Sequence, residues 1–114
     1  MAEKPLVYLA CPYSHHDPAV RLQRFEAANK AAAKLMSEGI MIFSPISHTH
    51  PIALAGCLPL GWEFWRAYDR AFLGHSHKII VLKLDGWRES VGIKGELEIA
   101  TELGITIEFM EEVQ

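Results

Sequence analysis

The sequence has little cysteine, no long apolar run and no excess of basic charge. Two cysteines in 114 residues, Cys11 and Cys57, are too few for a secreted disulfide scaffold. No apolar stretch approaches the roughly 20 residues of a membrane span, and the N-terminus lacks the pattern of a signal peptide. Eleven Lys and Arg against 14 Asp and Glu argue against a broad basic surface. We therefore expect a cytoplasmic protein without membrane or duplex nucleic-acid partners.

What is present indicates one ordinary globular domain. A chain of 114 residues is too short for two independent cores, and its 50% apolar content is enough for one core without a metal. The six histidines occur in close pairs, but the spacings of known metal sites are missing. We expect a single domain over residues 1–114 that needs no metal and no organic cofactor.

Hydrophobic periodicity divides the chain into alternating strands and helices. Asp17 followed by Pro18 is typical of a helix start, and Gly39 and Gly104 are typical of positions just past a helix end. Strands are expected at residues 6–10, 40–43, 78–84 and 105–109, and helices at residues 17–39, 61–74 and 92–103. This β-α-β-α-β-α-β order predicts a three-layer α/β/α fold around a mostly parallel, flavodoxin-like or Rossmann-like sheet of four to five strands.

Residues 44–60 are rich in His, Pro and Gly, and they are expected to form a long loop. A loop of that length in a small domain is usually functional or an oligomer contact. Together with the helix that carries Trp62 and Trp65, it is a candidate interface of a homodimer or a higher homo-oligomer.

The residues that follow the first three strands are candidates for ligand binding. In an open α/β sheet, ligands bind outside the carboxyl ends of the strands. Segments 11–16, 44–50 and 85–95 follow those ends, and they contain most of the unusual residues of the chain. One or two of His15, His16, His48 and His50 are expected to hydrogen-bond a ligand there.

Glu96 is the first candidate catalytic residue. Ser90 and Gly92 precede it at a helix start, where free N–H groups can receive a phosphate. We expect Glu96 in the first helical turn, where the helix dipole favours an ionised carboxylate. From the pattern alone, the interpretation as an ordinary first-turn glutamate that stabilises the helix is favoured.

Asp69 is the second candidate. It shares a helical face with Trp62, Trp65 and Phe72, so we expect it to be partly shielded from water, with a raised pKa. A shielded acid beside an ionised carboxylate suits glycosidic-bond chemistry. The alternative is an aspartate that caps or hydrogen-bonds a loop. Cys11 could act as a nucleophile with a histidine, but the interpretation as a small buried apolar residue is favoured.

These residues resemble the nucleoside 2-deoxyribosyltransferase-like superfamily over nearly the whole chain, and most closely a branch of small bacterial and phage proteins. The resemblance is carried by residues 8–14, 43–48 and 84–87, and by the spacing of Ser90, Gly92, Glu96 and Gly104. It departs from the pattern after the first strand, where Pro12-Tyr13-Ser14 replaces the usual glycine-rich loop.

The resemblance implies an N-glycosidase or 2-deoxyribosyltransferase that acts on nucleosides or their 5′-monophosphates. Glu96 would attack the anomeric carbon, and Asp69 would protonate the leaving base or orient Glu96. The alternative is a non-catalytic module that binds or senses nucleotides on the same fold. The expected substrate-binding residues are Cys11, Pro12, Tyr13, Ser14, His15, Ser44, His48, Ser90 and Gly92.

Overall fold

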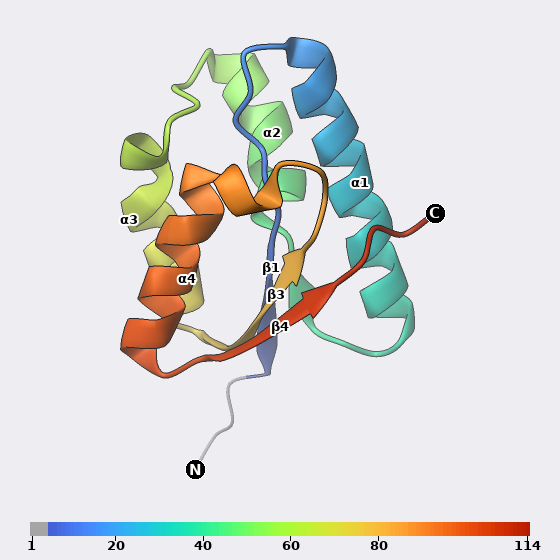
Figure 1. Cartoon of the computed structure of the whole chain (residues 1–114), viewed down its shortest axis with the longest axis vertical. Coiled ribbons are helices and arrows are strands. Elements are labelled where there is room, and N and C mark those ends of the chain that lie inside the picture. The colour runs from blue at the N-terminus through green and yellow to red at the C-terminus, as the bar shows by residue number, and fades with distance from the viewer. Residues whose placement is uncertain (1–4) are drawn as a thin grey trace.

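A computed structural model describes residues 5–114, which form one sheet of four strands with four α-helices around it (Figure 1). The strands are β1 (Leu6–Ala10), β2 (Ile42–Phe43), β3 (Ser76–Leu82) and β4 (Thr106–Met110). The helices are α1 (Pro18–Ser37), α2 (Pro45–Gly56), α3 (Trp62–Leu73) and α4 (Val91–Leu103), and a short 3-10 helix, η1 (Trp87–Glu89), precedes α4.

All four strands are parallel, in the spatial order β2-β1-β3-β4. Tyr8 in β1 lies opposite Phe43 on one side and Ile79 on the other. The α/β class and the parallel sheet are therefore confirmed. The order is that of a flavodoxin-like sheet, in which the chain moves from β1 to β2 on one side and then crosses to β3 on the other side of β1.

Both faces of the sheet are buried, because the side chains of each strand alternate between two helical layers. Val7 and Leu9 of β1 pack in the layer of α1. Tyr8 and Ala10 point the other way and pack in the layer of α3 and α4. The same layers lie on opposite sides of the sheet in Figure 1. This alternation decides which strand residues can meet the helices α3 and α4.

The expected loop over residues 44–60 is wrong, because most of it is the helix α2. Ser44 is its N-cap, and the Ser44 hydroxyl accepts a hydrogen bond from the Ser47 N–H at 3.4 Å, with Pro45 in the first helical position. Pro51 lies inside the helix, where it removes one backbone donor. The His, Pro and Gly content of residues 44–60 favoured a loop, but Ser44-Pro45 is the same kind of helix-start signal as Asp17-Pro18.

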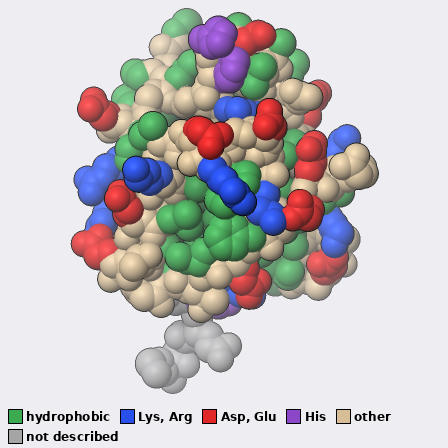
Figure 2. All heavy atoms as spheres, viewed as in Figure 1, with side chains coloured by type: hydrophobic (Ala, Val, Ile, Leu, Met, Phe, Trp, Pro, Cys, Tyr) green, Lys and Arg blue, Asp and Glu red, His purple; other side chains and the backbone are tan. Residues whose placement is uncertain are grey.

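The remaining differences are shifts at element ends. β2 is only two residues long, and β3 begins at Ser76 and ends at Leu82 rather than spanning 78–84. No helix within residues 5–114 has the length and apolar character to cross a membrane. On the face shown in Figure 2, acidic side chains separate the basic ones, around a central apolar area over β3 and β4.

Candidate functional site

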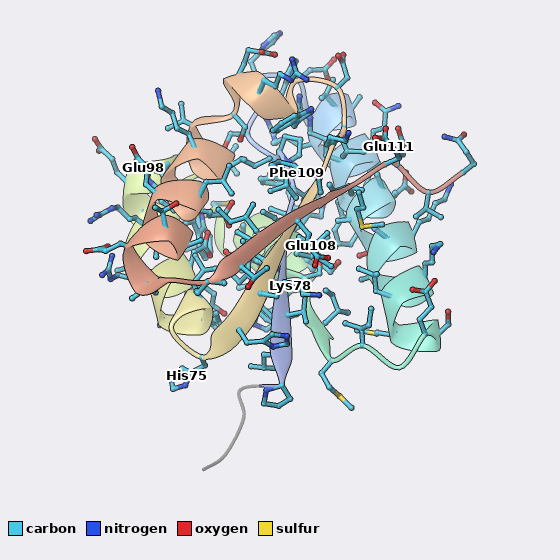
Figure 3. The ribbon with its side chains drawn as sticks, turned by 60° about the horizontal axis from the view of Figure 1, so that its bottom comes forward. His75, Lys78, Glu98, Glu108, Phe109 and Glu111 are labelled. Carbon is cyan, nitrogen blue, oxygen red and sulfur yellow. The ribbon has the colours of Figure 1, made fainter. Side chains whose placement is uncertain are left out.

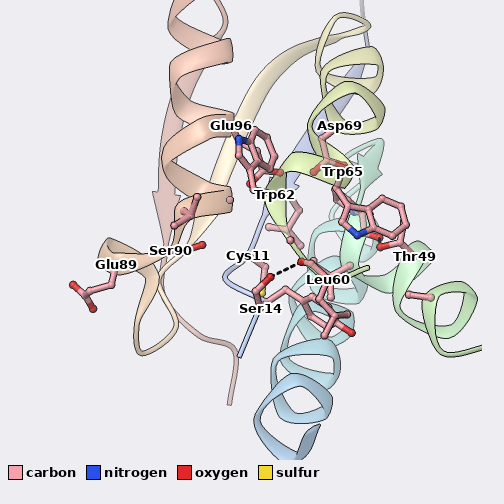
Figure 4. A pocket seen from close by; sticks show the side chains of 18 residues that line it. Cys11, Ser14, Thr49, Leu60, Trp62, Trp65, Asp69, Glu89, Ser90 and Glu96 are labelled. Atoms are coloured by element: carbon pink, nitrogen blue, oxygen red, sulfur yellow. Dashed lines mark hydrogen bonds between the residues drawn. The ribbon is translucent and has the colours of Figure 1, made fainter. Parts of the chain in front are cut away.

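A cavity of about 390 Å³ opens at the carboxyl ends of β1 and β3 (Figure 4). Its walls come from the segment after β1, from α2 up to Ala53, from α3 up to Asp69 with the residues just before it, and from the first half of α4 with the residues just before it. This is the switch point between β1 and β3, where the order of the strands reverses and where ligands of flavodoxin-like folds bind. The volume lies within the range of small-molecule sites.

Two buried carboxyl groups face this cavity from neighbouring helices. Glu96 on α4 is 5% exposed and Asp69 on α3 is 9% exposed, and both line the cavity. The helices α3 and α4 pack side by side, so the two side chains meet at the same wall (Figure 4). The Tyr8 hydroxyl, which comes from β1 beneath them, donates a hydrogen bond to Glu96 Oε2.

Burial raises the pKa of both carboxyl groups. The pKa of Glu96 lies well above its usual value because of burial first and the charge of Asp69 second, whereas the hydrogen bond from Tyr8 opposes the rise. Burial raises the pKa of Asp69 from 3.8 to about 6, and interaction with Tyr8 again lowers it. Burial also raises the pKa of Tyr8 itself, so its hydroxyl keeps the proton that it donates. Each carboxyl group of the pair therefore keeps its proton to a higher pH than an exposed carboxyl group does.

The expectation that Glu96 is a first-turn carboxylate kept ionised by the helix dipole is wrong. Val91 begins α4, so Glu96 is its sixth residue and lies in the second turn. The helix N-terminus acts over the first turn only. Burial therefore dominates, and the donor that favours the charged form is the Tyr8 hydroxyl.

The Trp62 indole packs directly on α4 beside this pair. A Cβ atom placed on Gly95 would lie 2.4 Å from Cε2 and Cζ2 of the Trp62 ring. Gly95 therefore lets the ring lie against the helix, where it lines the cavity next to Glu96. Trp65 lines the same cavity, and its indole N–H donates to the carbonyl oxygen of Pro59 at 2.8 Å.

Gly95→Ala is expected to lower the free energy of unfolding by about 1–3 kcal/mol, because the ring or the helix must move. Gly92→Ala is the matched control on the same helix. Its new Cβ would have Ser90 Oγ at 3.8 Å as its nearest neighbour, so a gain of up to about 1 kcal/mol is expected. Urea denaturation of both variants measures the difference. Equal stability would contradict the packing of Trp62 on Gly95.

The segment after β1 is held in place from both sides. The Ser14 hydroxyl donates to the carbonyl oxygen of Leu60 at 2.7 Å, as the dashed line in Figure 4 marks. The Tyr13 hydroxyl is hydrogen-bonded to the buried His50 ring, which also stacks on Phe25 at 4.3 Å between ring centroids. Burial lowers the pKa of His50, so its neutral form is favoured.

The structure brings most of the expected site residues together. Glu96 and Asp69 share the cavity wall with five of the expected binding residues: Cys11, Tyr13, Ser14, Ser90 and Gly92. The Ser90 hydroxyl caps α4 by accepting from the Ile93 N–H at 3.2 Å. By helix geometry, the N–H groups of Val91 and Gly92 have no acceptor within the helix and lie at the cavity wall.

Four expected binding residues lie elsewhere. The Pro12 side chain is fully buried, and the Ser44 hydroxyl is used to cap α2. His15 lines a second, smaller cavity on the other side of its loop, because adjacent residues of an extended segment point in opposite directions. His48 is exposed on α2, where its ring lies 6.5 Å from that of Tyr68.

Cys11 lines the cavity, but burial raises the pKa of its thiol far above the usual value. The thiol lies 3.3 Å from the carbonyl oxygen of Pro12, so it behaves as a buried, protonated side chain. This fits the small buried residue rather than the nucleophile. Within residues 5–114, no group of three or more His, Cys, Asp or Glu side chains is arranged to hold a metal ion.

Tyr8 is the important residue that the site prediction missed. Tyr8 is the alternate residue of a buried strand, and strand periodicity put it on the face opposite Val7 and Leu9. A tyrosine at a fully buried position needs a partner for its hydroxyl, which was the available signal. His50, one of the four histidines expected to hydrogen-bond a ligand, does not line the cavity, and its ring is hydrogen-bonded to Tyr13 instead.

Comparison with known proteins gives one family. A model described as a domain of unknown function, DUF1937, matches residues 5–112, so the chain belongs to this family. No curated protein matches the sequence.

Proposed function

We propose that this DUF1937 domain is an N-glycosidase or 2-deoxyribosyltransferase for nucleosides or their 5′-monophosphates, related to the nucleoside 2-deoxyribosyltransferase-like superfamily. The observation that carries the proposal is the pair of buried carboxyl groups, Glu96 and Asp69, at one wall of a cavity of about 390 Å³. Burying two carboxyl groups side by side costs stability, so a use for them is expected.

In the proposed reaction Glu96 is the nucleophile. Its carboxylate attacks the anomeric carbon of the sugar, and the C1′–N bond breaks with its electron pair moving to the base nitrogen. The transition state resembles an oxocarbenium ion, so a nearby negative charge stabilises it. A glycosyl ester of Glu96 results. Water or a second base then attacks the anomeric carbon and releases the ester as a carboxylate.

Asp69 supplies the proton that the leaving base needs. The pKa of Asp69, about 6, leaves a protonated fraction near neutral pH. When the two carboxyl groups share one proton, the productive arrangement has Glu96 ionised and Asp69 protonated. The hydrogen bond that the Tyr8 hydroxyl donates to Glu96 stabilises the ionised form of Glu96 in that arrangement, and Tyr8 lowers the pKa of Asp69 as well. Trp62 and Trp65 offer aromatic faces for the base at the same wall.

A non-catalytic nucleotide-binding module is the second candidate. The raised pKa of Glu96 favours it, because a protonated carboxyl group is a hydrogen-bond donor to a sugar hydroxyl and not a nucleophile. The two functions differ in whether the C1′–N bond of the ligand is broken.

Incubation of the protein with 2′-deoxynucleosides and their 5′-monophosphates tests the proposal. We expect free base to appear in proportion to enzyme concentration, measured by chromatography, with and without a second base as acceptor. Ligand binding without release of any base would favour the binding module instead.

A further inference from the structure

The cavity that holds the two carboxyl groups has an unusual charge. Three acidic residues line it: Asp69, Glu96 and, at its rim, Glu89. Among the residues that the structure describes, its lining includes no Lys, Arg or His. A 5′-phosphate carries close to two negative charges at neutral pH and is normally bound by Arg or Lys.

The nearest arginines hold the protein backbone instead. Arg24 on α1 donates to the carbonyl oxygens of Ser14 at 3.1 Å and Asp85 at 3.2 Å. Arg21 donates to the carbonyl oxygen of His15. Both guanidinium groups therefore fix the segments after β1 and β3, and neither lines the cavity.

Two other cationic side chains near the site, Arg88 and His50, are also engaged. Arg88 lies over the ring of Trp87, 5.2 Å from its centroid. His50 stands behind the cavity wall, where it is hydrogen-bonded to Tyr13, and its lowered pKa favours the neutral ring. Neither supplies a positive charge for a phosphate inside the cavity.

The start of α4 could offer a phosphate in the cavity only neutral donors, which are backbone N–H groups and the Ser90 hydroxyl. The N–H groups of Val91 and Gly92 reach the wall, whereas Glu89, directly before the N-cap Ser90, turns its side chain away from the cavity (Figure 4). Neutral donors do not compensate the charge of a dianion, and Asp69, which is ionised above about pH 6, repels it. A neutral sugar hydroxyl fits better, because it can accept from an N–H and donate to a carboxylate.

We infer that this site takes nucleosides without a 5′-phosphate, and that the acidic cavity wall excludes their 5′-monophosphates. The inference rests on the proposed function for the reaction, but the charge of the cavity decides the substrate class. The lining offers a dianion no compensating cation, and the carboxylate of Asp69, ionised above about pH 6, repels it more strongly because a buried site has a low dielectric.

The test compares 2′-deoxyadenosine and thymidine with their 5′-monophosphates on the same preparation. We expect kcat/KM and affinity for each nucleoside to exceed those for its monophosphate by at least about tenfold. Isothermal titration calorimetry measures affinity independently of turnover. Equal or tighter binding of the monophosphates would overturn the inference and leave the proposed reaction standing.

The variant Glu89→Lys tests whether the charge near the cavity, rather than the net charge of the protein, sets the preference for nucleosides over monophosphates. It is expected to narrow the ratio of nucleoside to monophosphate affinity about threefold or more, since it places a cation at the rim. Glu98→Lys is the matched control, because Glu98 projects from the outer side of α4 and changes net charge equally (Figure 3). Glu98→Lys should leave the ratio unchanged.

The outcomes distinguish the two proposals. Selective nucleoside binding without base release would overturn the reaction but support the inferred ligand class. Release of base from the monophosphates alone would support the reaction and overturn the inferred ligand class. Absence of binding by both ligand classes would overturn both proposals, and equal ratios in Glu89→Lys and Glu98→Lys would overturn the role of the cavity wall.

Discussion

Replacing Glu96 with glutamine is expected to abolish base release while the fold and nucleoside binding are kept. Gln is close to Glu in size and can accept the Tyr8 hydrogen bond, but it cannot form the glycosyl ester. We expect kcat to fall by at least about 10³-fold, as when an enzymatic nucleophile is removed. The measurement is single-turnover release of base, with affinity determined by calorimetry on the same variant.

Glu98→Gln is the control for this experiment, because Glu98 is exposed two residues further along the same helix. It should release base at the wild-type rate. A Glu96→Gln protein that releases base as fast as the wild type would show that Glu96 is not the nucleophile. Unfolding by urea checks that any loss of activity is not a loss of fold.

Asp69→Asn is expected to stabilise the protein at neutral pH and to slow base release. The folded-state pKa of Asp69 is raised from 3.8 to about 6, so the folded protein binds this proton more tightly than the unfolded chain does. The stability that the group contributes is complete below about pH 4, and it is lost as pH rises through about 6. Above that pH, the buried charge costs up to about 3 kcal/mol, which Asn avoids.

Urea denaturation at pH 4 and pH 7 measures this effect. The difference between Asp69→Asn and wild type should be small at pH 4 and larger, in favour of the variant, at pH 7. Glu102→Gln is a control of opposite sign, because the ion pair with Arg70 at 2.9 Å lowers the pKa of exposed Glu102. Glu102→Gln should bring no gain at pH 7. A loss of stability in Asp69→Asn at pH 7 would instead indicate a capping role for Asp69.

Both variants test one physical idea: the site keeps two buried carboxyl groups where neutral side chains would give a more stable fold. Neutral side chains of the same shape would be cheaper to bury at these two positions. Gains in stability that accompany losses of activity are the usual signature of a functional site. An effect in the same direction on both properties would identify the carboxyl pair as structural.

Local sequence signals determined the architecture of the chain. Short apolar runs made strands, Asp17-Pro18 began α1, and Gly104 ended α4 in a left-handed conformation that favours glycine. The same kind of reasoning placed Asp69 on a helical face with Trp62 and Trp65. It failed at α2, where the Ser44-Pro45 start was outweighed by composition.

Only the tertiary structure decided the chemistry of the pair. Asp69 and Glu96 are 27 positions apart, and the sequence alone does not say how deeply α4 buries Glu96 or that Tyr8 lies beneath both groups. The depth of burial depends on how α3 packs against α4 through Trp62 and Gly95. Periodicity tells which face of an element is apolar, whereas the protonation of a carboxyl group depends on the water and charges that remain around it after packing.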